Sequence, residues 1–156
     1  MSSDHTERIN KLKNLPRQLE AAIAGLSESQ LSTPYRDGGW TPRQVVHHVA
    51  DSHMNAFIRM KLILTEEHPT LKLYDQEVWA ELPDVRSPLE ASLAIIRGLH
   101  QRWVTLLENV PETAWARTGL HPESGEVSLD SMLTTYAQHG ENHVGQITGL
   151  RSARGW

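Results

Sequence analysis

Three stretches of this sequence carry the residues that begin an α-helix, and they constrain the fold more than any other feature. Residues 41–44 (Thr-Pro-Arg-Gln) and 87–90 (Ser-Pro-Leu-Glu) each match a capping box with proline at the first helical position. Ser128 offers a third cap, and the acidic residue two positions later suits the positive end of a helix dipole. The sequence therefore predicts three helices, which cover about 41–65, 87–109 and 128–151.

A fourth helical pattern lies near the N-terminus, where apolar residues keep helical spacing from Ile9 to Leu26. Pro16 interrupts the pattern, so this helix either kinks or restarts there, because proline removes one hydrogen bond and clashes with the preceding turn. No segment shows sustained strand alternation with hairpin signals. Four such helices predict an all-α four-helix bundle, and the length of 156 residues favours one domain over residues 1–156.

The connections between the predicted helices are unequal in length. Residues 66–86 and 110–127 are long for links between bundle helices, and loops of that size often serve function. We expect a short helix near residues 74–82 in the first connection and a polar turn at residues 121–126 in the second. Residues 27–30 (Ser-Glu-Ser-Gln) are placed to cap one further short turn.

The composition excludes several classes of protein. Cysteine is absent, which rules out disulfides, thiolate metal ligands and a cysteine nucleophile. No apolar run is long enough to cross a bilayer, and the first residues lack the pattern of an export signal, so we expect a cytoplasmic protein without a membrane partner. The formal charge of −4, with no long basic run, argues against a nucleic-acid partner.

Two of the nine histidines, His139 and His143, lie on or beside the apolar stripe of the last predicted helix. Residues four apart differ by only about 40° around a helix axis, so both rings can reach one point, and this spacing is a known metal-chelating pattern. Gln146 is placed to add a hydrogen bond at the same point. The alternative is that both rings are core histidines bonded to backbone or water.

A third histidine, His48, lies on the inward stripe of the helix predicted from residue 41. His47 and His53 are rotated away from it by about 100° and about 140°, so neither shares its direction. Burying three imidazoles without partners is costly, and a shared metal ion removes that cost by taking one lone pair from each ring. The remaining histidines share no face and are expected on the surface: His5, His68, His100 and His121.

Residues 38–55 (Gly-Gly-Trp-Thr-Pro-Arg-Gln-Val-Val-His-His-Val-Ala-Asp-Ser-His-Met-Asn) and 139–146 (His-Gly-Glu-Asn-His-Val-Gly-Gln) resemble the DinB/YfiT-like superfamily, and within it the YfiT-type branch of metal-dependent hydrolases. The similarity runs from about Leu15 to the C-terminus. Many relatives carry a further histidine where this chain has Asn142. The resemblance implies a four-helix bundle, often a homodimer, with one divalent nickel or zinc ion on three histidines that fall here on His48, His139 and His143.

Three neutral imidazoles leave a fourth coordination position open, as in catalytic zinc sites. Water bound there has its pKa lowered toward neutrality, so metal-dependent hydrolysis of a small molecule is the simplest function. The alternative, which other branches of the superfamily imply, is a thiol S-transferase in which the metal activates a low-molecular-weight thiol of the bacillithiol type. A third possibility is a metal-binding module without catalysis.

The sequence leaves the catalytic residues unknown. Asp51 and Glu141 are near the predicted ligands in sequence, but each is rotated away from its neighbouring ligand, which favours a solvated surface position for both. Three acids of the first long connection are placed to fold over the opening of a metal site: Glu77, Glu81 and Asp84.

Overall fold

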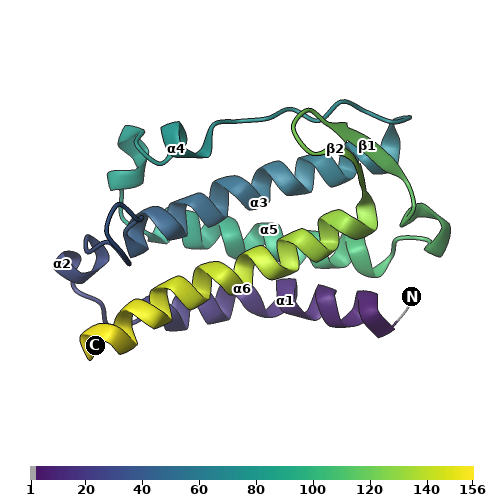
Figure 1. Cartoon of the computed structure of the whole chain (residues 1–156). Helices are drawn as coiled ribbons and strands as arrows, with labels where there is room; N and C mark the ends of the chain where they lie inside the picture. The colour runs from purple at the N-terminus through teal and green to yellow at the C-terminus, as the bar shows by residue number, and fades with distance from the viewer. Residues whose placement is uncertain (1–2) are drawn as a thin grey trace.

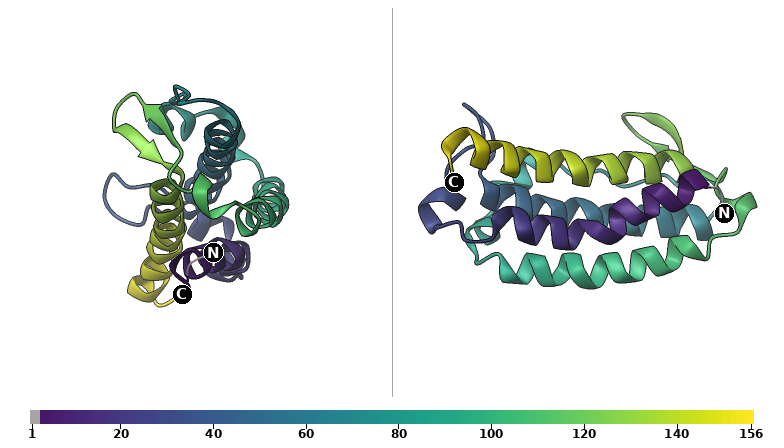
Figure 2. Two further views of the ribbon diagram at one scale, coloured as in Figure 1. Left: turned by 90° about the vertical axis from the view of Figure 1, so that its right-hand side faces the viewer. Right: turned by 90° about the horizontal axis from the view of Figure 1, so that it is seen from below.

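The computed structural model describes residues 3–156 and shows a four-helix bundle, as predicted (Figure 1). Its long helices are α1 (Ser3–Ile23), α3 (Pro42–Thr65), α5 (Glu90–Glu108) and α6 (Leu129–Arg154). Helix α1 packs against α5 and α6, and α3 packs against the same two helices on the opposite side of the bundle (Figure 2). No helix among residues 3–156 combines the length and apolar character that a membrane-spanning segment needs.

The connection between α3 and α5 is long because these two helices run in the same direction. Residues 66–89 therefore return along the outside of the bundle before α5 begins (Figure 1). The short helix predicted in this stretch is present as α4 (Gln76–Trp79), and the 3-10 helix η1 (Pro83–Arg86) follows it. Both elements contact α3, so the returning segment forms a cover along that helix.

The predicted caps at Ser27, Thr41 and Ser128 are all present. The Ser27 box begins the short helix α2 (Glu28–Leu31), the Thr41 box begins α3, and the Ser128 box begins α6. In each of them the capping hydroxyl accepts from a backbone amide three residues on, and the side chain at that position bonds back to the cap. These local signals therefore position the starts of two helices that carry predicted metal ligands.

The cap predicted at Ser87 is wrong. Helix α5 begins at Glu90, and Leu89 stands at the cap position without a side-chain hydrogen bond. Ser87 instead ends η1, where its amide donates to a backbone carbonyl of that turn. Its own carbonyl accepts from Arg43 and lies 3.1 Å from a ring nitrogen of His47. Because these contacts hold Ser87 in the preceding turn, the helix starts three residues later.

Helix α1 continues through Pro16 without a break, which excludes a restart at that residue. Its buried stripe includes Leu12, Leu15 and Leu19. Proline lacks the amide hydrogen that would bond to the carbonyl four residues earlier, so the Leu12 carbonyl loses its helical donor. Packing against α5 and α6 holds the helix together across this gap.

A β-hairpin lies between α5 and α6, where the sequence shows no sustained strand alternation, and its turn falls within the polar turn predicted at residues 121–126. Following the 3-10 helix η2 (Glu112–Ala114), strands β1 (Thr118–His121) and β2 (Gly125–Ser128) pair antiparallel. Four-residue strands are too short to show sustained alternation. Gly125 takes the positive φ of 77° that the turn requires. Strand β1 also bonds to residues 69–71 through Leu120, which ties the returning segment to the hairpin.

Two apolar clusters fill the bundle, and a polar layer separates them along the helices. On α5, His100 lies between Ile96 of one cluster and Trp103 of the other. On α3, His53 likewise lies between the two clusters in sequence. The polar layer inside the bundle is therefore built from histidines.

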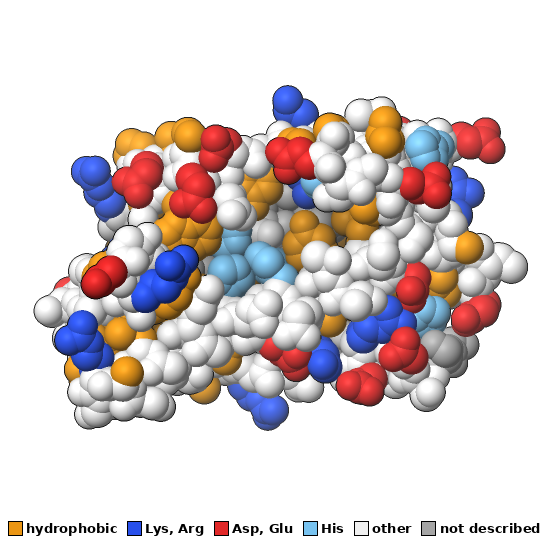
Figure 3. Space-filling model, viewed as in Figure 1, with side chains coloured by type: hydrophobic (Ala, Val, Ile, Leu, Met, Phe, Trp, Pro, Cys, Tyr) orange, Lys and Arg blue, Asp and Glu red, His pale blue; other side chains and the backbone are white. Residues whose placement is uncertain are grey.

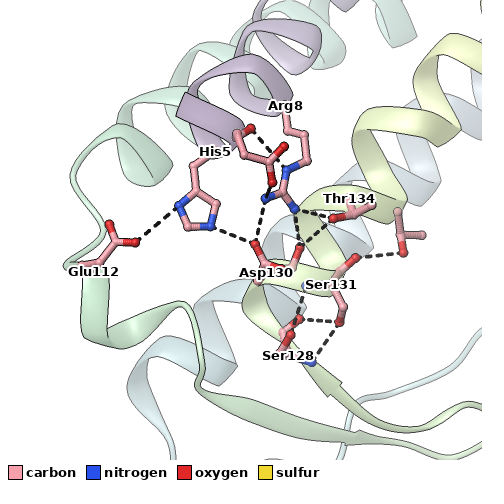
Figure 4. A network of polar contacts seen from close by, with 9 residues as sticks. His5, Arg8, Glu112, Ser128, Asp130, Ser131 and Thr134 are labelled. Carbon is pink, nitrogen blue, oxygen red and sulfur yellow. Dashed lines mark hydrogen bonds and ion pairs between the residues drawn. The ribbon is translucent and has the colours of Figure 1, made fainter. Parts of the chain in front are cut away.

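The prediction that His5 lies on the surface is also wrong. This residue is buried, and its ring stacks on Trp115 with the centroids 4.1 Å apart. Its Nε2 atom lies 2.8 Å from a carboxylate oxygen of Asp130, and Arg8 approaches the same oxygen at 3.0 Å (Figure 4). Arg8 also bonds to Thr134, so the start of α1 is held to the first turns of α6 (Figure 4).

Replacing Asp130 by alanine should lower the free energy of unfolding at pH 7 by about 1 kcal/mol, a figure discounted for its 43% exposed side chain. Partial burial raises the pKa of Asp130, but hydrogen bonds from His5 and Arg8 outweigh it and lower that pKa below 3.8. The carboxylate therefore stabilises the fold above about pH 4, and this contribution is lost on further acidification. Urea denaturation at pH 7 measures it.

The matched control is Glu7→Ala, since Glu7 is an exposed acid on α1 whose ion pair with Lys11 spans 4.0 Å. We expect that variant to unfold at nearly the wild-type urea concentration. Equal midpoints for the two variants would show that the Asp130 contacts add no stability beyond that of an ordinary surface pair.

Candidate metal centre

The structure brings together the three histidines that the sequence singled out. His48 comes from α3, and His139 and His143 come from α6. One ring nitrogen from each lies within 4.8 Å of the other two. The Nε2 atom of His139 is 3.2 Å from that of His48 and 3.1 Å from that of His143.

These distances fit the binding of one metal ion. Two nitrogens that each lie about 2.0–2.1 Å from a tetrahedral ion are about 3.3 Å apart. Burial, followed by the neighbouring His143, lowers the pKa of His48 to about 3, and burial, followed by His143 and His48, lowers that of His139 to about 3. The rings are therefore neutral at pH 7, which is the form that binds a metal.

Gln146 makes the contact that the sequence predicted. Its Oε1 atom lies 2.8 Å from Nδ1 of His143. Because an amide oxygen only accepts, Nδ1 of His143 carries the proton, and the lone pair of its Nε2 is left for an ion. Asn142, which stands where many relatives have a histidine, bonds instead to the exposed Gln138 on the same helix.

Trp40 forms one wall of the centre, a role that the sequence analysis did not assign. Its ring lies 4.5 Å from that of His48 and is nearly parallel to that of His143, with the centroids 6.3 Å apart. Its Nε1 atom donates to Glu77 of α4. Trp40 therefore shields the histidines on one side and is held in place by the returning segment.

The acids that were expected to fold over the opening have other partners. Glu77 accepts from Trp40, and Glu81 accepts from the side chain of Gln44. Both contacts fix the cover to the start of α3. Asp84 acts at a distance on Asp51, whose pKa rises to about 6 because of burial first and the Asp84 charge second.

Asp51 and Glu141 have the same intermediate exposure but lie in different surroundings. Glu141 pairs with Lys11 of α1 at 3.1 Å, at the partly exposed surface, as expected. Asp51 is likewise partly exposed, and burial with the nearby Asp84 charge raises its pKa. Its position on α3, three residues after His48, places it one turn away from the centre along the helix.

A cavity of about 630 Å³ opens beside His139. Figure 3 shows histidine side chains at the floor of a hollow on this face of the molecule. Polar and aromatic side chains from α3, α6 and the returning segment line much of it: Ser52, Arg59, Tyr74, Thr135 and Tyr136. His121, expected on the surface, also lines it, and the exposed His68 lies at the surface as predicted.

His53 and His100 were missed as members of the site. His53 is 0% exposed, and its Nε2 atom lies 3.1 Å from Nδ1 of His139. His100 is 1% exposed, so its predicted surface position is wrong. Its spacing from the buried Ile96 and Trp103 marks the inward stripe of α5, and this was the signal in the sequence.

Comparisons with known proteins identify the family of this chain. Residues 11–147 match the model of the DinB superfamily. A protein of Oceanobacillus iheyensis named putative metal-dependent hydrolase is 49% identical over 150 residues, which cover 96% of this chain and 87% of that protein. A protein of the same name from Bacillus mycoides is 50% identical over 148 residues, which cover 95% of this chain and 86% of that one.

Solved structures show the same fold. YfiT from Bacillus subtilis, described as a probable metal-dependent hydrolase with an unusual four-helix bundle topology, superposes with a TM-score of 0.96 at 42% identity, covering 100% of this chain and 91% of that one. The four-helix bundle protein TT2238 superposes with a TM-score of 0.60 at 22% identity, covering 97% of this chain and 99% of that one. This similarity supports the fold alone. This chain therefore belongs to the DinB superfamily and is similar to YfiT-type members that are named putative or probable metal-dependent hydrolases.

Proposed function

We propose that this protein is a metal-dependent hydrolase of a small molecule, with one zinc or nickel ion on His48, His139 and His143. The observation that carries the proposal is the meeting of three neutral imidazoles, through one nitrogen each, beside a cavity of about 630 Å³. That volume suits a small molecule. The names of the relatives from Oceanobacillus iheyensis and Bacillus mycoides point to the same class of reaction.

A divalent ion held by the three histidines would supply Lewis acidity and would activate water for hydrolysis. The protein's own groups then have three tasks. The imidazoles would hold the ion, and Trp40 would keep solvent from one side of the centre. Tyr74 and Tyr136 line the cavity, and we expect their hydroxyls to orient a polar substrate.

A hydrolysis panel with chromogenic esters, an anilide and a phosphate ester tests this proposal on zinc- and nickel-loaded protein. We expect turnover of at least one class, loss of turnover with chelator, and loss in His139→Ala. The control His47→Leu should keep it, since His47 is buried on the same helix but bonds to Ser92 and Ser87 outside the centre.

The same samples can be offered bacillithiol or glutathione with monochlorobimane. Conjugation that depends on the metal, without hydrolysis of any ester, anilide or phosphate, would replace the hydrolase proposal by a thiol S-transferase. Stoichiometric metal with no turnover in either assay would overturn the proposed activity and leave a binding module.

A further inference from the structure

A chain of hydrogen bonds leads from the metal centre across all four long helices. Nδ1 of His139 on α6 lies 3.1 Å from Nε2 of His53 on α3. Nδ1 of His53 lies 2.9 Å from Nε2 of His100 on α5. Nδ1 of His100 lies 2.7 Å from the backbone carbonyl oxygen of Leu12 on α1. Each link joins a different pair of helices.

The donor and the acceptor of the last hydrogen bond in this series are fixed. A carbonyl oxygen can only accept, so Nδ1 of His100 must donate to Leu12. The carbonyl is available because Pro16, four residues later, has no amide hydrogen to bond to it. The proline inside α1 thus provides an acceptor in the middle of the bundle, where a regular helix would use it internally.

This direction passes from ring to ring because a neutral imidazole has one donor and one acceptor nitrogen. With the proton of His100 on Nδ1, its Nε2 accepts from Nδ1 of His53. Nε2 of His53 then accepts from Nδ1 of His139. The proton of His139 is therefore on Nδ1, and its Nε2 presents a bare lone pair to His48 and His143.

Burial favours the neutral forms that this logic needs. It lowers the pKa of His53 well below 6.5, with further lowering by His100 and His139, and it lowers the pKa of His100 to about 4 against a smaller opposing effect of the Leu12 carbonyl. The chain also ends inside the protein at Leu12. A backbone carbonyl has no proton to release, so this series of hydrogen bonds orients a ring and does not deliver protons beyond Leu12.

We propose that His53 and His100 are positioning residues that fix the tautomer of His139 and aim its Nε2 at the metal ion. This proposal rests on the metal site of the proposed function, but not on the reaction. Partners of this kind orient metal-binding histidines and raise their basicity, and their loss weakens metal binding by about 10–100-fold.

A purely structural role for these buried rings makes a different prediction. His47 is a matched case, since it is buried on α3 and both of its ring nitrogens have partners, Ser92 and the Ser87 carbonyl. If these histidines only filled the core, replacing His53 or His47 by leucine would change stability without a selective change in metal affinity.

The first test is zinc affinity, measured by competition with a chromophoric chelator at pH 7.5. We expect His53→Leu and His100→Leu to bind zinc about 10–100-fold more weakly than the wild type, and His47→Leu to stay within about threefold of it. Circular dichroism establishes that each variant is folded. Wild-type zinc affinity in a folded His53→Leu protein would overturn the proposal.

The second test uses the wild-type protein, so it does not depend on any variant folding. Long-range ¹H–¹⁵N spectra of the metal-free protein should show that the three hydrogen-bonded histidines, His139, His53 and His100, are protonated at Nδ1. A His139 ring protonated at Nε2 would overturn the proposal even if zinc binds. Zinc binding without turnover would leave it intact and contradict only the proposed hydrolase activity.

Discussion

Saturating zinc should raise the melting temperature of the metal-free protein by about 10 °C at pH 7.5. An ion that binds only the folded state at 1,000 times its Kd adds about 4 kcal/mol to the free energy of unfolding. For a domain of this size, each kcal/mol corresponds to about 2–4 °C. The ligating nitrogens come from two helices 91 residues apart in sequence, at His48 and His139, so an unfolded chain does not hold them together.

Differential scanning calorimetry with and without zinc measures this shift, and a chelator should reverse it. His139→Ala provides the control, because it removes the nitrogen that lies between the other two. We expect its melting temperature to be nearly independent of zinc. A wild-type melting curve that does not move with zinc, nickel or chelator would contradict a metal ion bound inside the bundle.

Acidification from pH 7 to pH 5 should strongly lower the free energy of unfolding of the metal-free protein. Burial lowers the pKa of His48 and of His139 to about 3, and that of His100 to about 4, from 6.5 in the unfolded chain. Between pH 6.5 and these lower pKa values the unfolded state binds protons that the folded state does not. The free energy of unfolding is therefore undiminished by these histidines above about pH 6.5 and falls as pH decreases.

The expected loss is large compared with the stability of a typical domain. At pH 5 each of these three histidines lowers the free energy of unfolding by about 2 kcal/mol, or about 6 kcal/mol together. His53 lowers it further. Natural domains are stable by about 5–15 kcal/mol. Urea denaturation at half-unit steps of pH should show stability falling steeply below pH 6.5. An unchanged stability between pH 7 and pH 5 would show that these rings are not buried in neutral form.

The parts of the fold that local chemistry determines could be predicted from the sequence. The caps at Thr41 and Ser128 depend on hydrogen bonds within four residues, and both are present. The cap predicted at Ser87 depends on the same chemistry, but contacts from α3 hold that residue in the preceding turn. The hairpin was missed because its strands have four residues each, and pairing with residues 69–71 helps to hold it.

In the candidate site, too, local geometry could be predicted from the sequence and tertiary contacts could not. His139 and His143 are one helical turn apart, so their meeting follows from α-helix geometry. The partners of His100 could not be deduced, because they depend on how α1 and α3 pack against α5. The gap that Pro16 leaves at Leu12 could be predicted locally, but the residue that fills it could not.

The most direct test of the metal centre is the metal content of the protein purified without a nickel column. Elemental analysis of the wild type and of the control His47→Leu should find about one equivalent of zinc or nickel per chain. The variants His48→Ala and His139→Ala should each retain almost none after dialysis. A full equivalent of metal in both alanine variants would contradict the assignment of these histidines as ligands.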